Sequence, residues 1–377
     1  MSLDGVFRRA FGDDEPTHAG SGWTTGVLAV ALGVFAAGGV LCLHMPDLLT
    51  TPDLRGRYPL PLVRGLIQAL IGLAFLCGLL SALSRRRKVL GVTGMGLALA
   101  ASLAGGASVE IAGPVSSRLA LGLDWFLLNL LLLAVIFVPL ERWRPLREEQ
   151  LVFRPLWTTD SVHFFVSHLL VQVTTWLSLA PATILFAWAA RPEIQGAVKG
   201  QPLVLQVLEI VLVADLTQYA VHRAFHVVPA LWRFHSVHHS STTMDWLAGS
   251  RLHLVDTIAT RGLTFLPLFL LGFDERALGA YLVFVSFHAV FIHANVRFRL
   301  GALEPFLVTP RYHHWHHASA PEARDRNFAV HLPVLDRVFG TRHLPPGAWP
   351  AEYGLGDGRS FPESWLGQTV APFRRRI

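Results

Sequence analysis

Long apolar runs limit what this chain can fold into more than any other feature of its sequence. A helix needs about 18 or more apolar residues to cross a bilayer. Six such runs are clear, at residues 22–43, 60–83, 89–112, 119–140, 164–190 and 203–221. Backbone inside lipid must satisfy its own hydrogen bonds, and a helix does so within one segment. We therefore expect an all-α fold, a multi-pass integral membrane helical bundle.

Two later runs, 254–271 and 277–292, are apolar but interrupted. Asp256 and Arg261 lie within the first of them, and the charged residues 274–276 connect the two. A full hairpin and a shallow re-entrant hairpin both fit this pattern. The chain is 52% hydrophobic and only 15% charged, which argues against the two soluble domains that 377 residues could otherwise form.

Basic residues beside the runs predict how the bundle is oriented. Residues 85–88 follow the second run, and four arginines between positions 142 and 154 follow the fourth. The positive-inside rule places both segments in the cytoplasm. Counting runs from there puts the N-terminus and the histidine-rich segments on the cytoplasmic face. The same residues account for the net charge of +6 without a nucleic-acid partner, because they do not form one soluble patch.

Composition divides the chain into four parts. The first run begins late and is long enough to span, so we expect it to be retained rather than cleaved as a signal peptide. Residues 141–160 combine arginine, proline and tryptophan, which is typical of a juxtamembrane linker. We expect a cytoplasmic tail at 1–21, a four-span bundle at 22–140, a catalytic domain at 141–345 and a basic tail at 346–377. The catalytic domain should carry its histidines in a helical cap on the cytoplasmic face.

The histidines are concentrated in one part of the chain. Twelve of the eighteen lie between His222 and His317, and two segments there share the pattern HxxHH. On a helix, residues at i, i+3 and i+4 lie on one face, so each such box can direct three imidazoles into the same space. Imidazole suits iron, zinc, copper and nickel. This spacing predicts a polyhistidine metal site.

Eight histidines in three boxes form the main ligand set, and His293 joins them because it ends an apolar helix that faces the boxes. The nine candidate ligands are His222, His226, His235, His238, His239, His293, His313, His316 and His317.

Five further residues lie near the candidate ligands in the sequence, and three of them are candidates for a supporting role. Asp215 and Tyr219 lie on the same helical stripe as the first two candidate ligands, and a carboxylate often holds a ligating imidazole by its second nitrogen. His253 fits either a ligand or such a supporting residue. We leave His288 and His314 outside the ligand set, because both fall off the arc of their neighbours.

Cysteine usage excludes several kinds of metal site. The only two cysteines, Cys42 and Cys77, lie inside apolar runs, so the chain offers no disulfide framework and no cysteine-ligated zinc or iron–sulfur centre. Electrons for any redox reaction must therefore come from outside the chain.

Five sequence segments together resemble the sterol desaturase/fatty acid hydroxylase superfamily: HRAFH, WRFHSVHHS, HANV, PRYHHWHHAS and DRNF…LDRVFGT. The resemblance covers about residues 141–345. It implies a non-haem centre of two ferrous or ferric ions, bound by the histidine boxes at the cytoplasmic face. Such a centre uses O2 to hydroxylate or desaturate a lipid alkyl or sterol carbon. The resemblance also implies a separate cytochrome or ferredoxin as electron donor. His253-Leu254 departs from the His-Pro that the family often has, which leaves the role of His253 open.

Three other functions fit a histidine-rich membrane protein less well. A metal transporter or sensor would place ligands along a path through the membrane rather than at one face. A bis-histidine haem protein needs axial pairs on facing helices rather than triplets. Metal-assisted hydrolysis needs a catalytic carboxylate, and the boxes contain none.

Overall fold

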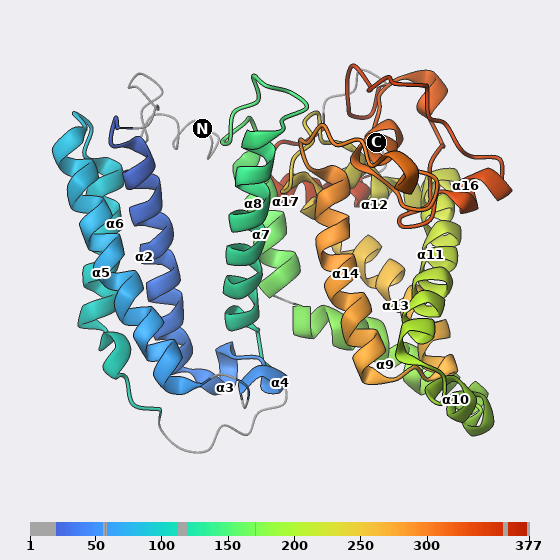
Figure 1. Ribbon diagram of the computed structural model, residues 1–377, viewed down its shortest axis with the longest axis horizontal. Helices are drawn as coiled ribbons and strands as arrows, with labels where there is room; N and C mark the ends of the chain where they lie inside the picture. Colours follow the sequence, from blue (N-terminus) through green and yellow to red (C-terminus); the bar gives the residue numbers. More distant parts are fainter. Residues whose placement is uncertain are drawn as a thin grey trace. The chain divides into compact units, whose positions relative to one another are not determined.

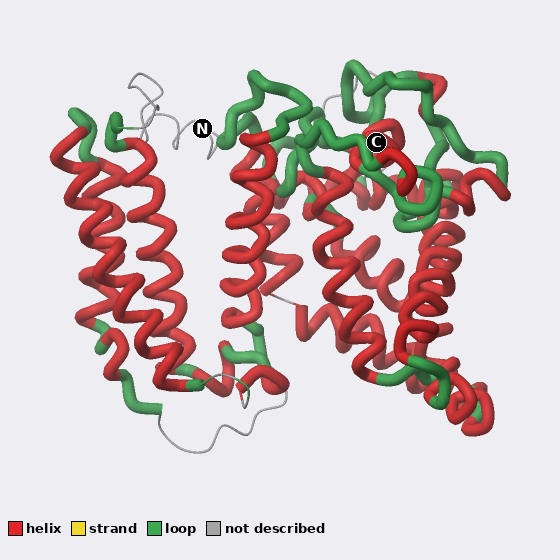
Figure 2. The backbone as a smooth tube through the Cα atoms, viewed as in Figure 1, coloured by secondary structure: helices red, strands yellow, loops and turns green. Residues whose placement is uncertain are grey.

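The structure is a computed structural model that describes residues 20–55, 57, 59–111, 120–169, 171–356 and 361–374. Within these ranges helices are the only regular elements, and no β-strand occurs (Figure 2). Among the described residues, seven helices are long and apolar enough to cross a membrane. The predicted class, an all-α integral membrane protein, is confirmed. The side of the membrane on which the histidines lie stays a prediction, and most of the predicted N-terminal tail lies outside the described residues.

The helices of the described chain have the following bounds. The α-helices are α2 (Trp23–His44), α3 (Pro46–Leu49), α4 (Pro52–Arg55), α5 (Leu60–Ser84), α6 (Val89–Leu103), α7 (Leu123–Trp143), α8 (Trp157–Leu169), α9 (Val171–Phe186), α10 (Pro192–Lys199), α11 (Leu203–Val227), α12 (Pro229–His239), α13 (Leu254–Leu271), α14 (Glu275–His293), α15 (Pro310–His316), α16 (Val334–Val338) and α17 (Trp365–Val370). Short 3₁₀ helices occur at Gly106–Ser108, Ala187–Ala189, Ala248–Ser250, Gly301–Leu303, Pro321–Ala323 and Ala371–Phe373.

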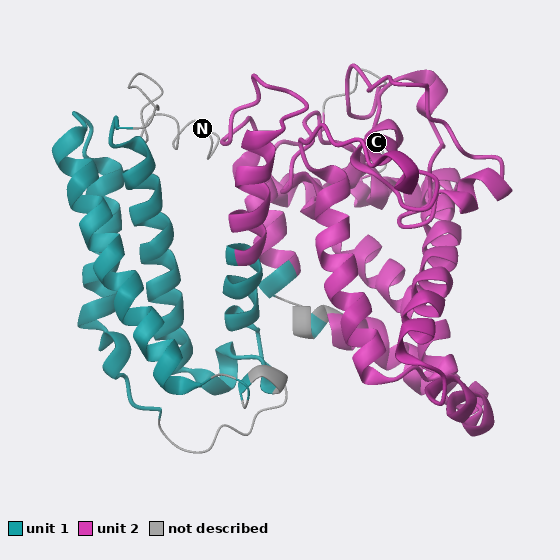
Figure 3. Cartoon of the chain, in the orientation of Figure 1, with its two compact units in different colours: residues 1–131, 168–173 teal, residues 132–167, 174–377 magenta. Residues whose placement is uncertain are grey.

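The chain divides into two compact units, shown in different colours in Figure 3. Unit 1 comprises residues 1–131 and 168–173, and unit 2 comprises residues 132–167 and 174–377. The division falls within α7, between residues 131 and 132, whereas the composition predicts a boundary at 140.

Unit 1 packs α2, α5 and α6 through small residues. A β-carbon on Gly94 of α6 would lie 2.4 Å from the β-carbon of Ala29 in α2, and one on Gly91 would lie 2.4 Å from the carbonyl oxygen of Gly78 in α5. Only glycine allows such close approach of helix backbones, which is how many membrane helices associate.

The predicted span 164–190 covers two described helices. α8 has 13 residues and α9 has 16, and residue 170 between them lies outside the described residues. α8 begins seven residues earlier than the apolar run and carries buried polar side chains, including Asp160 and His163.

The interrupted pair of runs forms two helices, each long enough to span a membrane. α13 and α14 are 18 and 19 residues long and are joined by a short turn. Gly272 ends α13 with a left-handed φ of 68°, and the Asp274 carboxylate accepts a hydrogen bond from the backbone N–H of Arg276 at the start of α14.

Unit 2 carries the histidine boxes at one end. α12, α16 and α17 lie at that end of the unit and α10 lies at the other (Figure 1). The C-terminal residues 361–374 pack against this end, because His163 in α8 bonds Gln368 through Nε2 and Oε1, 2.8 Å apart. The arginine-rich segment after α7 lies there too, since Arg147 donates its backbone N–H to Asn295 just beyond α14.

We expect Gly94→Ala to destabilise unit 1, because its new β-carbon would overlap Ala29. Overpacking of this kind costs about 1–3 kcal/mol. Gly96→Ala is the matched control, since nothing lies within 4 Å of a β-carbon there and alanine favours a helix. Thermal unfolding of the two full-length variants in the same detergent would measure the difference. Equal unfolding temperatures would contradict the packing described here.

Candidate metal centre

Nine histidine side chains gather in two groups in unit 2. The five-histidine group contains His222, His226, His235, His239 and His316. The four-histidine group contains His238, His293, His313 and His317. Within each group, one nitrogen from every ring lies within 4.8 Å of the others. These are the nine candidate ligands of the sequence analysis, and the structure brings all of them together.

Each HxxHH box is divided between the two groups. On α12, His235 and His239 belong to the five-histidine group, whereas His238 belongs to the other. At α15 the division is reversed, because only His316 joins the five-histidine group. The spacing predicts that each box directs three imidazoles into one space. Instead, the two adjacent groups each draw on both boxes.

The ring nitrogens in each group face one another without a proton between them. His222 and His235 place their Nε2 atoms 3.1 Å apart, and both rings donate their Nδ1–H elsewhere, to the Phe328 carbonyl and to Asp256. His238 and His293 repeat the arrangement at 3.3 Å, with Nδ1 of each bound to a backbone carbonyl. Two bare nitrogen lone pairs at this distance repel unless a cation lies between them.

Burial keeps these imidazoles neutral. Removal from water, together with neighbouring imidazoles, lowers the pKa of His238, His239 and His317 well below 6.5. The Nε2 atoms of His226, His239 and His316 are buried and have no hydrogen-bond partner in the described chain. Buried polar atoms normally have a partner. Neutral imidazoles are the form that binds metal, so this donor set fits two divalent ions.

Two carboxylates support the five-histidine group. Asp256 lies 2.7 Å from Nδ1 of His235, and Asp325 lies 3.3 Å from Nδ1 of His226. A carboxylate on the outer nitrogen fixes the ring and makes the inner nitrogen a stronger ligand. The sequence marked Asp256 as an interruption of an apolar run and, through the family resemblance, as a position where an acidic residue is usual, but its contact with His235 was not predicted.

Asp215 has a different role from the one predicted. Its carboxylate accepts three backbone N–H groups, from Val330, His331 and Leu332, and does not bond an imidazole of either group. Asp336 accepts the N–H groups of Phe328 and Ala329. Together the two carboxylates hold the loop whose Phe328 carbonyl accepts from His222. Asp215 therefore supports the candidate centre indirectly, through the loop that contacts His222.

Tyr219 and His253 also lie outside the two groups. The hydroxyl group of Tyr219 bonds the Thr341 hydroxyl at 2.8 Å, and its ring stacks on Phe339. His253 caps the start of α13, because its Nδ1 accepts from the backbone of Val255, and its Nε2 lies 3.0 Å from the Thr369 carbonyl.

The two histidines left out of the ligand set lie elsewhere as well. His288 bonds His331 through their Nδ1 atoms, 3.1 Å apart, and His314 bonds the hydroxyl group of Tyr353 at 2.9 Å.

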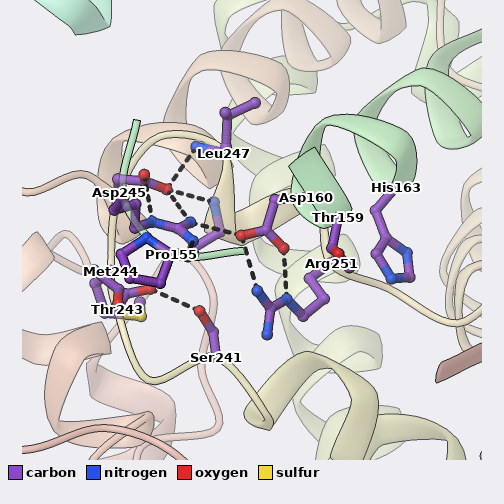
Figure 4. A network of polar contacts seen from close by, with 12 residues as sticks. Pro155, Thr159, Asp160, His163, Ser241, Thr243, Met244, Asp245, Leu247 and Arg251 are labelled. Carbon is purple, nitrogen blue, oxygen red and sulfur yellow. Dashed lines mark hydrogen bonds and ion pairs between the residues drawn. The ribbon is translucent and has the colours of Figure 1, made fainter. Parts of the chain in front are cut away.

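Figure 4 shows a buried ion-pair network. It adjoins the four-histidine group through Arg251, whose carbonyl contacts His238. Arg154 donates to Asp160 at 2.6 Å and to Asp245 at 2.7 Å, and Arg251 donates to Asp160 at 2.9 Å. Burial by itself would raise the pKa of Asp160, but the charges of Arg251 and Arg154 hold it below its usual value. Sequence reasoning missed this network, because its members are far apart in the chain and carry no local pattern.

The network holds the loop that supports two candidate ligands. The Arg251 carbonyl accepts from Nδ1 of His238, 3.1 Å away. Gly249 in the same loop lies against His293, since a β-carbon there would be 2.9 Å from its Nδ1 atom. The Asp245 carboxylate accepts the backbone N–H of Ala248 and so fixes the turn from 245 to 248. The ring positions of His238 and His293 therefore depend on the buried charges.

Comparison with known proteins shows similarity to lipid hydroxylases in the part of the chain that carries the two histidine groups. Residues 207–341 match the family model described as fatty acid hydroxylase, and this range includes all nine histidines. No solved structure matches the chain.

Several curated proteins are similar to part of the chain. An ornithine lipid hydroxylase, OlsE of Rhizobium tropici, is 32% identical over 178 residues, which are 46% of this chain and 52% of that protein. The alkylglycerol monooxygenase of Danio rerio is 32% identical over 141 residues, 37% of this chain and 31% of that protein. The fatty acid hydroxylase vlmA of a Lecanicillium species is 29% identical over 145 residues, 34% of this chain and 40% of that protein. The chain thus spans about half the length, or less, of these relatives.

We expect Asp160→Asn to destabilise unit 2 strongly, because it leaves Arg251 buried without its carboxylate. Breaking a buried ion pair in this way costs about 3–5 kcal/mol. Asp274→Asn is the matched control, since Asp274 pairs with the exposed Arg276 and asparagine also caps a helix. Thermal unfolding in detergent should show a large fall for the first variant and little change for the second. Two equally small changes would contradict the importance of the network.

Proposed function

We propose, on the premise that residues 207–341 belong to the fatty acid hydroxylase family, that this chain is a membrane di-iron oxygenase. It would use O2 and two external electrons to hydroxylate or desaturate a lipid. The observation that carries the proposal is the pair of histidine groups, whose unprotonated nitrogens face each other in a buried space.

The nine histidines would hold two iron ions, one in each group. Bound iron would supply the oxidation of an unactivated C–H bond by O2. The chain's own residues keep the ligands neutral by burial, fix their rings through carbonyl and carboxylate partners, and exclude water from the centre. In the hydroxylation reaction, one oxygen atom of O2 enters the lipid and the other leaves as water, with two electrons and two protons consumed.

A lipid is the proposed substrate class for two reasons. First, three candidate ligands, His222, His226 and His293, lie toward the ends of α11 and α14, two of the helices long enough to span a membrane, so an alkyl chain in the bilayer is within reach of the centre. Second, the similar proteins are named for an ornithine lipid, an alkylglycerol and a fatty acid. These names share a lipid with a long alkyl chain, whereas their polar parts differ.

We place the centre on the cytoplasmic side and assign its electrons to a separate cytochrome or ferredoxin. The support for the side is the arginine-rich segment 142–154, which lies at the same end of unit 2 as the boxes. The support for a separate donor is that the two cysteines lie at 42 and 77, outside the matched region. The metal-transporter alternative is not favoured, because the nine rings form two compact groups rather than a row of ligands along a path through the membrane.

Purified full-length protein should contain about two irons per chain. With a reductant and membrane lipid it should consume O2, and mass spectrometry should show a lipid with one added oxygen or two lost hydrogens. His238→Ala should lower the iron content, because it removes a ligand from the four-histidine group. Metal analysis that finds one tightly held zinc and no iron would contradict the proposed function.

Asp256→Asn should weaken metal binding, because the outer nitrogen of His235 loses its carboxylate. Loss of such a partner typically lowers metal affinity about 10–100-fold. Competition with a chelator would measure the change. Asp325→Asn is the matched comparison, and its effect should be smaller because Asp325 is half exposed and its distance to His226 is 3.3 Å. Unchanged affinity in Asp256→Asn would show that the carboxylate does not tune the site.

A further inference from the structure

We propose that an arginine-lined pocket beside the four-histidine group is the docking site of an acidic one-electron carrier protein. We also propose that Trp349 and His314 conduct its electrons to His313. This inference rests on the proposed function, since an O2-dependent oxygenase needs an external electron supply.

The pocket has a volume of about 420 Å³ and combines basic, aromatic and backbone groups. Its lining residues are Leu146, Arg147, Arg297, Arg299, Trp349, Pro350 and Ala351. Two chain segments meet there, because Arg297 donates its backbone N–H to the Arg144 carbonyl at 2.8 Å and Leu146 donates to the Asn295 carbonyl at 3.2 Å. This pairing sets arginines of both segments side by side at the surface.

The arginines of this surface form no ion pair within the described chain. Arg142, Arg144, Arg147, Arg297 and Arg299 are all exposed. None of the five has a carboxylate within 4.0 Å among the residues that the structure describes. Unpaired charge of one sign steers a partner of the opposite sign and speeds its association.

The Arg147 side chain is held at the edge of the pocket rather than free. It donates from Nη2 to the carbonyls of Pro350 and Ala351, at 2.7 Å each, and its guanidinium lies 5.7 Å from the centre of the Tyr353 ring. The pocket is therefore built before a partner arrives, which lowers the entropy lost on docking.

An aromatic bridge leads from this pocket to the candidate metal centre. Trp349 is half buried, and its ring centre lies 5.3 Å from that of His314 in an edge-to-face contact. His314 is completely buried and bonds the hydroxyl group of Tyr353. It is joined by one peptide bond to His313, whose Nε2 atom lies 3.0 Å from that of His293. His314, which belongs to neither histidine group, would therefore conduct electrons between Trp349 and His313.

Anionic lipid headgroups are the other class of ligand for arginines at the ends of membrane helices. A lipid headgroup would bind the arginines, but it would have no need of the ring contact between Trp349 and His314 that leads toward the candidate centre. This contact therefore favours a redox protein as the partner. Each encounter would oxidise the carrier by one electron, and Trp349, His314 and His313 would conduct that electron to a ferric ion held by the histidines, reducing it to the ferrous state. Two encounters supply the two electrons that one O2 needs.

The test compares two electron donors of opposite charge. Iron-loaded, oxidised full-length protein in nanodiscs of zwitterionic lipid is mixed without O2 with reduced plant-type [2Fe–2S] ferredoxin, which is acidic, or with the methyl viologen radical cation. Loss of the absorbance of ferric iron gives the rate. The double variant Arg297→Glu, Arg299→Glu should be reduced by ferredoxin about tenfold or more slowly than the wild type at low salt. Its reduction by the viologen should not slow, and the ferredoxin effect should fade as salt screens the charges.

Two more variants separate docking from conduction. Arg337→Glu is the charge control, since Arg337 is an exposed arginine on α16 at the same end of unit 2, and it should leave both rates unchanged. Trp349→Leu should lower the limiting rate at saturating ferredoxin and leave the concentration for half-saturation unchanged. Trp349→Phe should restore most of that rate because it keeps a ring.

The outcomes separate this inference from the function on which it rests. Equal rates for the wild type and the double variant with ferredoxin would overturn the docking site while leaving the oxygenase intact. A double variant that loses only its affinity for anionic vesicles would identify the surface as a lipid site and would also overturn it. A preparation that binds no iron would overturn the proposed function and this inference with it.

Discussion

The repulsion between unprotonated imidazole nitrogens is the constraint on which the rest of unit 2 depends. His222 faces His235 and His238 faces His293, at 3.1 and 3.3 Å, and each of the four rings uses its own proton on an outer partner. Such an arrangement is unfavourable unless a cation occupies the centre or the surroundings hold the rings in place. The protein holds them: backbone carbonyls, a carboxylate and burial all keep the inner nitrogens bare.

The two groups are supported by different parts of the chain. The five-histidine group depends on Asp256 and on the loop that Asp215 and Asp336 hold through backbone N–H groups. The four-histidine group depends on the loop from 245 to 251, which is fixed by the pairs of Arg154 and Arg251 with buried aspartates. Apart from Asp256, the charged side chains that position the candidate ligands in this way touch none of them. This explains why ionisable residues accompany an otherwise apolar domain.

Much of the fold and of the site could be predicted from residue patterns. Apolar length gave the spanning helices, because a bilayer imposes a minimum length on each. Helical spacing predicted eight of the nine histidines, because i, i+3 and i+4 positions share a face, and His293 was predicted from its place at the end of an apolar helix. The apolar run at 164–190 did not show that α8 begins at Trp157, since Thr158, Thr159 and Asp160 are polar. Asp215 was assigned to an imidazole because its stripe points that way, yet the nearer backbone N–H groups of 330–332 fill its oxygens.

The sequence by itself determined which elements form and which residues offer metal-binding nitrogens, because both follow from local periodicity. Only the tertiary structure decided how those nitrogens are shared. It divided each HxxHH box between two groups, paired His235 with Asp256, and brought Arg154, Asp160 and Arg251 together beneath His238. These choices depend on contacts between residues far apart in the chain, which no spacing encodes. They are made by packing, which places each donor opposite an acceptor from another helix or loop.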